Sequence, residues 1–403
     1  MKVLIVNKFL YPNGGSETYI FKLGEQLESM GHEVQYFGME HPDRCVGNAA
    51  DSYTSNMDFH SGGIKGKLSK IAYPFKIIYS AESRRKIRAV LEEMKPDVVH
   101  LNNINFQLTP SIILEIKRWN KDCRIVSTIH DPQWVCPNHM LINGKTHKGC
   151  KDCLNGSYMS CIKSKCVHGS TLKSVLGAME AVFYKNIHVY RNVDAILCPS
   201  HFMEETMKHN PDIADRTIML RNFIAIGEPT ELRQDRYVLY FGRYSEEKGI
   251  HTLVKASRLC PDIPFIFAGN GPFEQEVNDT ENIRNVGFTT GTELANLIAN
   301  AQMTLIASEC YENCPFTVME SQMLHTPVIG ADIGGIPELI GEGVNGDLFE
   351  SGNPEDLADK IRALWEDRER LERYTEATKA IHYDSLEQYA KKVEAIYEGT
   401  YTS

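Results

Sequence analysis

Short apolar segments alternate with loops and amphipathic helices along this chain, and this order constrains its fold more than any other feature. Residues 3–6 are predicted as a buried strand, residues 7–16 as a loop with glycine and proline, and residues 33–37 as the next strand. Between them, a helix carries apolar side chains on one face and ends at Gly31. Strand, loop, helix and strand in this order form a βαβ unit, which predicts a parallel sheet.

The same order returns in the second half of the chain. Residues 237–241, 264–268, 283–286 and 303–306 are predicted strands. Residues 225–235 lack periodicity and are rich in glutamate, glycine and proline, which is typical of a linker. A chain of 403 residues also favours two domains over one. We therefore predict an α/β protein with one domain at 1–224, a linker at 225–235 and a second domain at 236–384.

The composition limits the classes of function. The chain is 42% hydrophobic and 24% charged, as expected for a globular protein, and its net charge of −10 argues against nucleic acid as a partner. It contains no run of about eighteen apolar residues, so no transmembrane helix is predicted, and residues 1–10 are too short for a signal peptide. We therefore expect a cytoplasmic protein whose eleven cysteines are not paired in disulfides.

Residues 308–338 hold the most informative polar motif. A predicted strand precedes it, and Pro315 can open a helix within it, because the nitrogen of a first-turn proline needs no acceptor. The loop 309–314 then lies at the carboxyl end of a strand and the amino end of a helix, which suits phosphate or sugar binding. Glu312 on this loop can meet ligand hydroxyls, and Glu320 in the helix can bind a ribose diol. The alternative is that both are solvated surface glutamates.

Three further loops carry residues that suit a nucleotide or a sugar. Gly14 and Gly15 allow a backbone to approach a diphosphate closely, or simply form a turn. Arg243 and Lys248 follow the strand 237–241 and can clamp a diphosphate, unless they are surface charges. His130 ends the strand 124–129, where ligands bind in open α/β sheets, unless it is a structural histidine.

A cysteine-rich insert follows that strand, with five cysteines and three histidines between residues 136 and 168. They are Cys136, Cys150, Cys153, Cys161 and Cys166, with His139, His147 and His168 among them. Cys150-x2-Cys153 followed by Cys161-x4-Cys166 has the spacing of a four-cysteine zinc site. Such thiolates can converge on one structural ion and fold an insert with little core, with Cys136 or a histidine as a substitute ligand. Free thiols in a packed loop and disulfides are the alternatives.

Residues 64–88 depart from the acidic average of the chain. Around them, positions 61–90 hold eight lysine and arginine residues against Glu82 alone, interleaved with apolar and aromatic side chains. This mixture suits an anionic membrane surface, at roughly 1 kcal/mol for each cation near the lipid. The alternative is a solvated helix that packs one face on the core.

The motif of Glu312 and Glu320, with the following Thr-Pro-Val-Ile and Gly-Gly-Ile-Pro-Glu, resembles the E-x7-E motif of the retaining glycosyltransferases of family 4. The resemblance extends from Gly14-Gly15 to the C-terminal helix, over nearly the whole chain. It implies the GT-B fold, in which two doubly wound, Rossmann-like domains face each other across a cleft, the first on the acceptor side and the second binding the nucleotide sugar. It also implies that residues 385–403 form a helix that crosses back to the first domain. A subset of the family carries a similar cysteine-rich insert after His-Asp.

The resemblance implies transfer of a sugar from a nucleotide diphosphate sugar, a UDP-sugar first and a GDP-sugar next, to a hydroxyl of a glycan or lipid-linked acceptor. Retention at the anomeric carbon and a role in cell-surface polysaccharide or glycan synthesis are implied too, with the protein cytoplasmic or peripheral on the inner face of the membrane. His130 and Glu312 are the expected catalytic residues. The expected nucleotide-sugar-binding residues are Gly14, Gly15, Arg243, Lys248, Asn313, Cys314, Pro315, Phe316, Thr317, Val318 and Glu320. No Asp-x-Asp motif is evident, so a cationic clamp is expected in place of a catalytic metal ion.

Several alternatives stay open. Relatives often have glycine after the first glutamate, whereas Asn313 and Cys314 stand here, so the donor sugar is not determined. A GT-B-shaped epimerase or phosphorylase, or a non-catalytic nucleotide-sugar-binding protein, would share the fold. The joint presence of His130, Arg243 and Lys248 with the two glutamates favours an enzyme. A nicotinamide dehydrogenase is disfavoured because no Gly-x-Gly-x-x-Gly follows the first strand.

Overall fold

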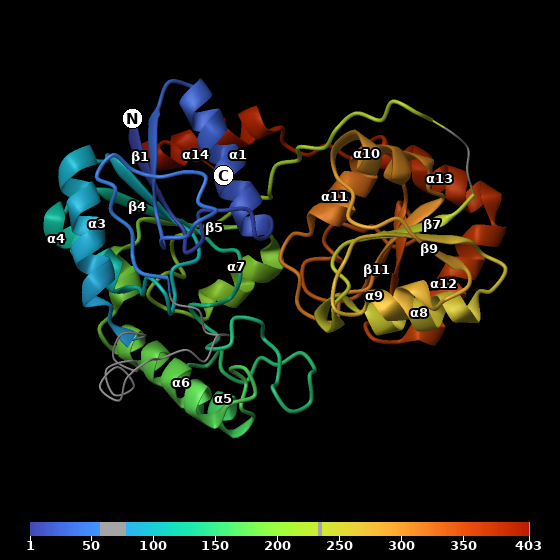
Figure 1. The fold of residues 1–403 in the computed structure, drawn as a ribbon, viewed down its shortest axis with the longest axis horizontal. Helices are drawn as coiled ribbons and strands as arrows, with labels where there is room; N and C mark the ends of the chain where they lie inside the picture. Colours follow the sequence, from blue (N-terminus) through green and yellow to red (C-terminus); the bar gives the residue numbers. More distant parts are fainter. Residues whose placement is uncertain (57–77, 233–235, 403) are drawn as a thin grey trace. The chain divides into compact units, whose positions relative to one another are not determined.

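The computed structural model describes residues 1–56, 78–232 and 236–402. The chain divides into two compact units, and each is built on one six-stranded parallel sheet (Figure 1). Unit 1 comprises Met1–Pro199, Met203–Leu220 and Leu386–Ser403, and unit 2 comprises Ser200–Phe202 and Arg221–Ser385. The predicted class, two doubly wound α/β domains, is confirmed.

Unit 1 has the strand order β2-β1-β3-β4-β5-β6, and all neighbouring strands are parallel. Its strands are β1 (Lys2–Val6), β2 (Glu33–Phe37), β3 (Val98–Leu101), β4 (Arg124–Thr128), β5 (Ala195–Cys198) and β6 (Thr217–Met219). Its helices are α1 (Gly15–Ser29), α3 (Ala81–Met94), α4 (Ser111–Trp119), α5 (Met159–Lys163), α6 (Thr171–Asn186), α7 (His201–Lys208) and α14 (Leu386–Glu398), with a 3-10 turn at Val189–Asn192. Successive residues of β1 are fully buried, so both faces of the sheet are covered.

The last helix, α14, is held in unit 1 by a buried hydrogen-bond network. Tyr19 of α1 shares its hydroxyl with Tyr389 and with Thr128, each at 2.9 Å. His100 of β3 contacts Thr128 Oγ1 at 2.8 Å through Nε2 and Tyr397 OH at 2.6 Å through Nδ1. Burial lowers the pKa of His100 to about 3, so its neutral ring donates through one nitrogen and accepts through the other. The helix is therefore docked by polar groups as well as by apolar packing.

Replacing Tyr397 by Phe tests this docking. The change leaves one ring nitrogen of the buried His100 without a partner, which costs about 1–3 kcal/mol. We expect a lower thermal midpoint for Tyr397→Phe, measured by circular dichroism. The control is Tyr401→Phe, at a partly exposed position beyond the helix, which should leave the midpoint unchanged. Equal midpoints for the two variants would contradict the docking role.

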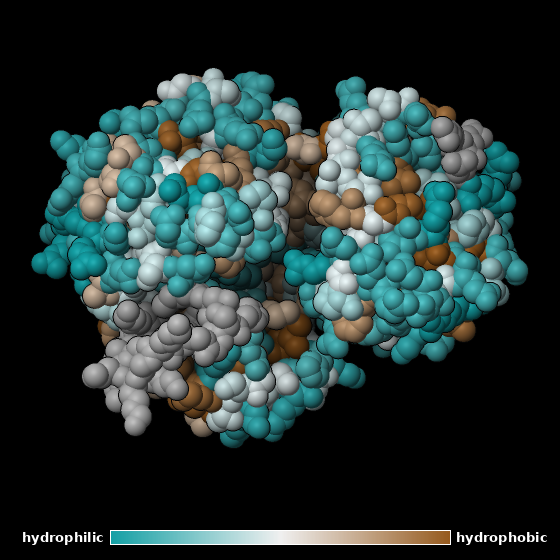
Figure 2. All heavy atoms as spheres, in the orientation of Figure 1, coloured by the Kyte–Doolittle hydropathy of each residue, from teal (hydrophilic) through white to brown (hydrophobic). Residues whose placement is uncertain are grey.

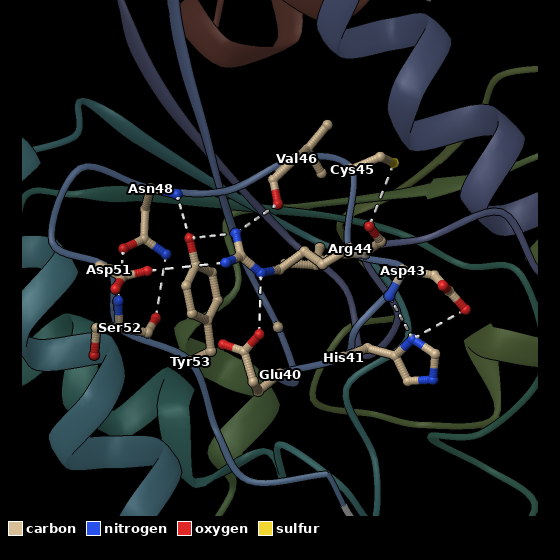
Figure 3. A network of polar contacts seen from close by, with 12 residues as sticks. Glu40, His41, Asp43, Arg44, Cys45, Val46, Asn48, Asp51, Ser52 and Tyr53 are labelled. Atoms are coloured by element: carbon tan, nitrogen blue, oxygen red, sulfur yellow. Dashed lines mark hydrogen bonds and ion pairs between the residues drawn. The ribbon is translucent and has the colours of Figure 1, made fainter.

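The segment after β2 is fixed by Arg44 and Tyr53 (Figure 3). The Arg44 guanidinium lies 3.8 Å from the centre of the Tyr53 ring, and its Nη1 donates to the Tyr53 hydroxyl at 2.8 Å. The same hydroxyl accepts from the Asn48 nitrogen at 2.9 Å. In this way the segment presents His41, which stacks on Tyr11 of the loop after β1 at 4.0 Å between ring centres. Aromatic groups thus stand beside the carboxyl edge of β1.

The basic segment predicted at 64–88 lies partly outside the described residues, which begin again at 78. Within α3, Arg84 and Arg88 both form ion pairs with the mostly buried Glu115 of α4. Two of the predicted lipid-facing cations are therefore engaged within unit 1. Nearby, apolar side chains are exposed along α5 and α6, visible as brown atoms in Figure 2; they are Met159, Leu172, Met179 and Val182.

Unit 2 has the strand order β12-β11-β10-β7-β8-β9, again all parallel. Its strands are β7 (Val238–Phe241), β8 (Phe265–Ala268), β9 (Ile283–Asn285), β10 (Met303–Ile306), β11 (Val328–Ala331) and β12 (Gly346–Phe349). Its helices are α8 (Ile250–Leu259), α9 (Glu274–Asn278), α10 (Gly291–Asn300), α11 (Phe316–Met323), α12 (Pro354–Glu366) and α13 (Arg368–Thr378), with a 3-10 turn at Glu246–Lys248. Apolar side chains of β7, β8, β10 and β11 form its main core with α8 and α12.

Among the described residues, no helix is both long enough and apolar enough to cross a bilayer.

Candidate active site

The candidate site of unit 2 lies where the strand order reverses, between β7 and β10. These strands are neighbours in the sheet, but the chain leaves them toward opposite sides, so the loops that follow them diverge at the carboxyl edge, where ligands bind in open α/β sheets. The loop after β7 ends at Gly249, whose φ of 70° is in the left-handed region. A Cβ at Gly249 would stand 1.9 Å from the Ala307 carbonyl oxygen. Glycine is therefore what allows the two loops to touch.

Lys248 and Glu312, one from each loop, meet at this point. The Lys248 Nζ lies 2.5 Å from Glu312 Oε1, and the Ser308 hydroxyl donates to the same oxygen at 2.6 Å. Burial lowers the pKa of Lys248, but the Glu312 carboxylate, together with Cys310 and Glu247, raises it by more, so the pKa lies above its ordinary value and the ammonium stays charged. The Lys248 side chain is 36% exposed, so a ligand can reach it. The sequence predicted both residues for the site but not their pairing.

Arg243 stands apart from this pair. Its side chain is 60% exposed, and its one ion-pair contact among the described residues is Glu247 Oε1 at 3.9 Å. A contact of that length at an exposed site contributes little to stability. The guanidinium is therefore available for a ligand, while its backbone is held because Tyr240 OH donates to the Arg243 carbonyl at 2.8 Å.

A third loop, after β11, closes on the other side of Glu312. The Gly335 nitrogen donates to the Glu312 carbonyl at 2.8 Å. A Cβ on Gly335 would stand 1.8 Å from the Asn313 carbonyl oxygen, and one on Gly334, where φ is 63°, 2.5 Å from the Glu312 carbonyl oxygen. The two glycines bring this backbone against the Glu312 loop and thereby fix the position of its carboxylate.

The variant Gly335→Ala should disturb this contact. Its methyl group would overlap a backbone oxygen, so the Asn313 carbonyl must move, at a cost of about 1–3 kcal/mol. We expect a lower thermal midpoint. Gly341→Ala serves as the control because the nearest atom to its Cβ lies at 3.5 Å, an ordinary contact. A Gly335→Ala protein as stable as Gly341→Ala would show that the loop contact is not needed.

The residues predicted around Pro315 have different surroundings. Cys314 and Val318 have buried side chains, and the Cys314 thiol contacts Met319 Sδ at 3.5 Å, so only their backbones are left for a ligand. Pro315 caps α11, and the Val318 nitrogen donates to its carbonyl. The nitrogens of Phe316 and Thr317 have no acceptor within the described ranges. Two free N–H groups at a helix start favour an anion there.

Glu320 is the fifth residue of α11. Its side chain has no hydrogen bond or ion pair in the described part of the chain. Burial raises the pKa of its carboxyl to about 7, above the ordinary 4.5. A carboxylate in this state has unsatisfied acceptors at neutral pH. It is suited to receive hydrogen bonds from a diol.

The pH dependence of stability follows from the direction of this shift. Because the pKa of Glu320 is higher in the folded state, its ionised carboxylate lowers the stability of the folded protein. This loss of stability is absent below about pH 4.5, grows between pH 4.5 and 7, and is complete above pH 7. We expect Glu320→Gln to stabilise the protein by about 1–2 kcal/mol at pH 8, after allowance for solvent screening, and by much less at pH 5. Urea denaturation at both pH values measures this. The exposed Glu281→Gln is the control, and a gain equal at both pH values would contradict the assignment.

In unit 1, the predicted His130 is held at the end of β4. Its Nε2 lies 2.8 Å from Asn102 Oδ1, and its ring meets Tyr19 edge to face at 5.0 Å. The carboxamide oxygen can only accept, so Nε2 carries the hydrogen and Nδ1 is an acceptor. Burial, with the nearby Lys8, lowers the pKa of His130 to about 3. The ring is therefore neutral at physiological pH and suited to orient a hydroxyl rather than to carry charge.

The predicted Gly14 and Gly15 start α1 and are exposed, and Gly14 caps the helix without a side-chain bond. Behind them, the sequence prediction missed a chain of buried polar side chains across the ends of β1, β3 and β4. It runs from Glu17 through Asn7, Asn103, Gln133 and Asn105 to Glu180, with successive hydrogen bonds of 2.8–3.2 Å, two of them donated by the backbone nitrogens of Asn103 and Asn105. Burial raises the pKa of Glu180 to about 8. The three asparagines at 102, 103 and 105, directly after a strand, were the signal that could have revealed it.

The four cysteines predicted as zinc ligands, Cys150, Cys153, Cys161 and Cys166, line one small cavity of the insert, together with Cys136. No group of three or more histidine, cysteine or acidic side chains in the described ranges is arranged to hold a metal ion as it stands. Among the three histidines of the insert, none lines the cavity.

Two protein-family models match this chain. Residues 13–226 match the model described as Glycosyltransferase Family 4, and residues 226–381 match that of Glycosyl transferases group 1. The chain belongs to glycosyltransferase family 4. Its fold is accordingly the GT-B fold, and the protein is a glycosyltransferase.

Two relatives of this glycosyltransferase match over most of their length. The N-acetyl-alpha-D-glucosaminyl L-malate synthase of Bacillus anthracis is 21% identical over 97% of this chain and 94% of that protein. A 42.6 kDa protein of the cps region of Klebsiella pneumoniae is 24% identical over 84% and 87%. Among solved structures, sucrose-phosphate synthase from Thermosynechococcus elongatus has a TM-score of 0.69 at 16% identity over 99% and 98%. Anabaena HepE in complex with UDP has 0.66 at 15% over 99% and 100%.

Proposed function

We propose that this family 4 glycosyltransferase takes a sugar from a nucleotide diphosphate sugar, a UDP-sugar before a GDP-sugar, and transfers it with retention to a hydroxyl of a glycan or lipid-linked acceptor. The observation that carries the proposal is the group of cationic side chains and free N–H groups at the carboxyl edge between β7 and β10, around the pair of Lys248 and Glu312. Structural neighbours described in complex with UDP and with UDP-glucose support the donor class.

The positive charges at this edge of the sheet can stabilise the leaving group. When the bond between the anomeric carbon and the diphosphate breaks, negative charge grows on the phosphate oxygens. Arg243 can bind those oxygens with two N–H groups, and Lys248 adds a point charge. The free nitrogens of Phe316 and Thr317 contribute helix-terminal donors. These groups can stabilise the charge without a catalytic metal ion, which is the form of the reaction we propose.

The two glutamates have separate tasks in this proposal. Lys248 and Ser308 both bind Glu312 Oε1, which leaves Oε2 with no partner in the described ranges to receive sugar hydroxyls. Glu320 would accept from the ribose diol, which replaces the hydrogen bonds that the carboxylate lacks. Ligand binding would then favour the ionised form of Glu320.

Retention follows if the acceptor oxygen attacks the anomeric carbon on the face from which the diphosphate departs. The acceptor hydroxyl would lose its proton to the departing phosphate oxygen, which is the base on that face. Transfer would thus need no covalent intermediate with the protein. A contact of the neutral His130 with the donor sugar involves unit 1 and stays a prediction.

A cytoplasmic location and an anionic membrane contact through 64–88 also stay predictions. The exposed apolar side chains on α6, Leu172, Met179 and Val182, recur at one-face spacing and support such a contact. The ion pairs of Arg84 and Arg88 with Glu115 reduce the positive charge that the segment 64–88 can offer to a membrane.

A thermal-shift screen with UDP-, GDP- and ADP-sugars tests the proposed donor. A ligand at a hundred times its Kd should stabilise the protein by about 2.7 kcal/mol, a shift of about 5 °C or more. We expect the shift for one nucleotide base and its loss in Arg243→Ala and Glu320→Ala. Arg284→Ala, exposed on β9, is the matched control and should keep it. No shift with any donor, in folded protein, would overturn the proposal.

Incubation of the shifting donor with acceptor alcohols separates the alternatives. Proton NMR of the product should show the anomeric configuration of the donor. An inverted product would exclude retention, an altered sugar without transfer would indicate an epimerase, and binding without turnover would indicate a nucleotide-sugar-binding protein.

A further inference from the structure

Five cysteines from distant parts of the insert converge on one small cavity. Asn138, Leu141, Ile142 and Ser160 complete its lining. All five carry free thiols, and they are Cys136, Cys150, Cys153, Cys161 and Cys166. Thirty positions separate the first from the last, so their meeting is a property of the fold and not of local sequence alone. Figure 1 shows the insert as irregular chain beside α5 and α6.

Two backbone elements bring the thiols together. A hairpin pairs Ile142 with Gly149, and the Cys150 nitrogen donates to the Leu141 carbonyl at 2.6 Å at its base. α5 carries Cys161, and the Cys166 nitrogen donates to the Cys161 carbonyl at 3.0 Å in the turn that follows. The hairpin tip packs on this turn, where a Cβ on Gly144 would stand 2.7 Å from the Cys166 Cα. One pair of cysteines thus belongs to the hairpin and its exit, and the other to the helical turn.

The insert has little apolar material to hold these elements. Its buried cluster consists of Cys153, Tyr158, Cys161, Val167 and Ala178, so cysteine supplies two of the five members. Its regular structure between residues 136 and 168 is the hairpin bridge and the five-residue α5. A segment of this size with so small a core usually depends on a cross-link or a metal ion.

We propose that the insert binds one structural Zn²⁺ through the thiolates of Cys150, Cys153, Cys161 and Cys166. Binding exchanges four thiol protons for four Zn–S bonds, and the tetrahedral ion has no open position, so its role is structural. The thiols line a common cavity but are not yet at ligand geometry. Rotation of the side chains into the cavity would complete the site and join the hairpin to the turn after α5.

The spacing of the cysteines, together with the hydrogen bond of the Cys136 thiol, favours four of the five thiols as ligands. The Cys136 thiol donates to Asn138 Oδ1 at 2.9 Å, and the Asn138 oxygen also accepts from the Met140 nitrogen. Cys136 is therefore engaged in its own turn, and we assign it outside the ligand set. The remaining four form two short-spaced pairs, which is the pattern of structural zinc sites.

Metal analysis of the full-length, tag-free protein tests the proposal. We expect about one zinc per chain by inductively coupled plasma mass spectrometry after purification from zinc-supplemented cells. Cys161→Ser and Cys150→Ser should each lose the ion. Cys136→Ser should keep it, as should Cys45→Ser, an exposed thiol outside the insert. Loss of zinc in Cys136→Ser would overturn the ligand assignment.

Limited proteolysis provides a readout that is independent of activity and of any variant's folding. Wild-type protein treated with a strong chelator should be cleaved within 137–168 at least tenfold faster, and added Zn²⁺ should restore its resistance. Protein that contains no zinc, and whose cleavage neither chelator nor zinc changes, would overturn the site. Thiol labelling under denaturing conditions distinguishes the remaining state, since disulfides would leave fewer than eleven reactive cysteines. The donor thermal shift concerns unit 2, so either proposal can fail without the other.

Discussion

Parallel pairing is the constraint on which both units depend. Because every strand of a parallel sheet points the same way, all the loops after the strands gather at one edge, and a reversal in strand order separates two of them. In unit 2 this happens between β7 and β10, and Lys248 and Glu312 are the residues placed there. The close backbone approaches at Gly249 and Gly335 hold the loops after these strands together, so that Lys248 and Glu312 form an ion pair. The chemistry of the site is thus a consequence of sheet order combined with glycine placement.

Much of this could be predicted from the sequence. Mostly apolar runs such as 3–6 and 303–306 correctly predicted the buried strands, since a strand covered on both faces carries mainly apolar residues. The loops at their ends identified the candidate residues, as Glu312 after β10 illustrates. What the sequence did not indicate is pairing at a distance, because no local pattern shows that Lys248 and Glu312 share an oxygen. For the same reason it predicted no role for Asn102, which orients His130 from the loop after β3.

The candidate site combines satisfied and unsatisfied groups. Glu312 is held by two donors, whereas Glu320 is partly buried on α11 and has no hydrogen-bond or ion-pair partner in the described part of the chain. A protein optimised for stability alone would not keep such a carboxylate, since its ionised form disfavours the folded state at neutral pH. A residue that lowers the stability of the folded state at a candidate binding site is typical of residues that are retained for a ligand.

The docking of α14 has a consequence for how the protein is made. The network of Tyr19 and His100 is completed by Tyr389 and Tyr397, which leave the ribosome only after the whole stretch Arg221–Ser385 of unit 2. Unit 2 is drawn almost entirely from one continuous stretch, Arg221–Ser385, that emerges before them. Synthesis of unit 1 therefore begins before that of unit 2 but is completed only after it. During translation, His100 lacks its partner Tyr397 until α14 has been synthesised. A chain truncated before α14 would therefore expose this polar core to chaperones and proteases.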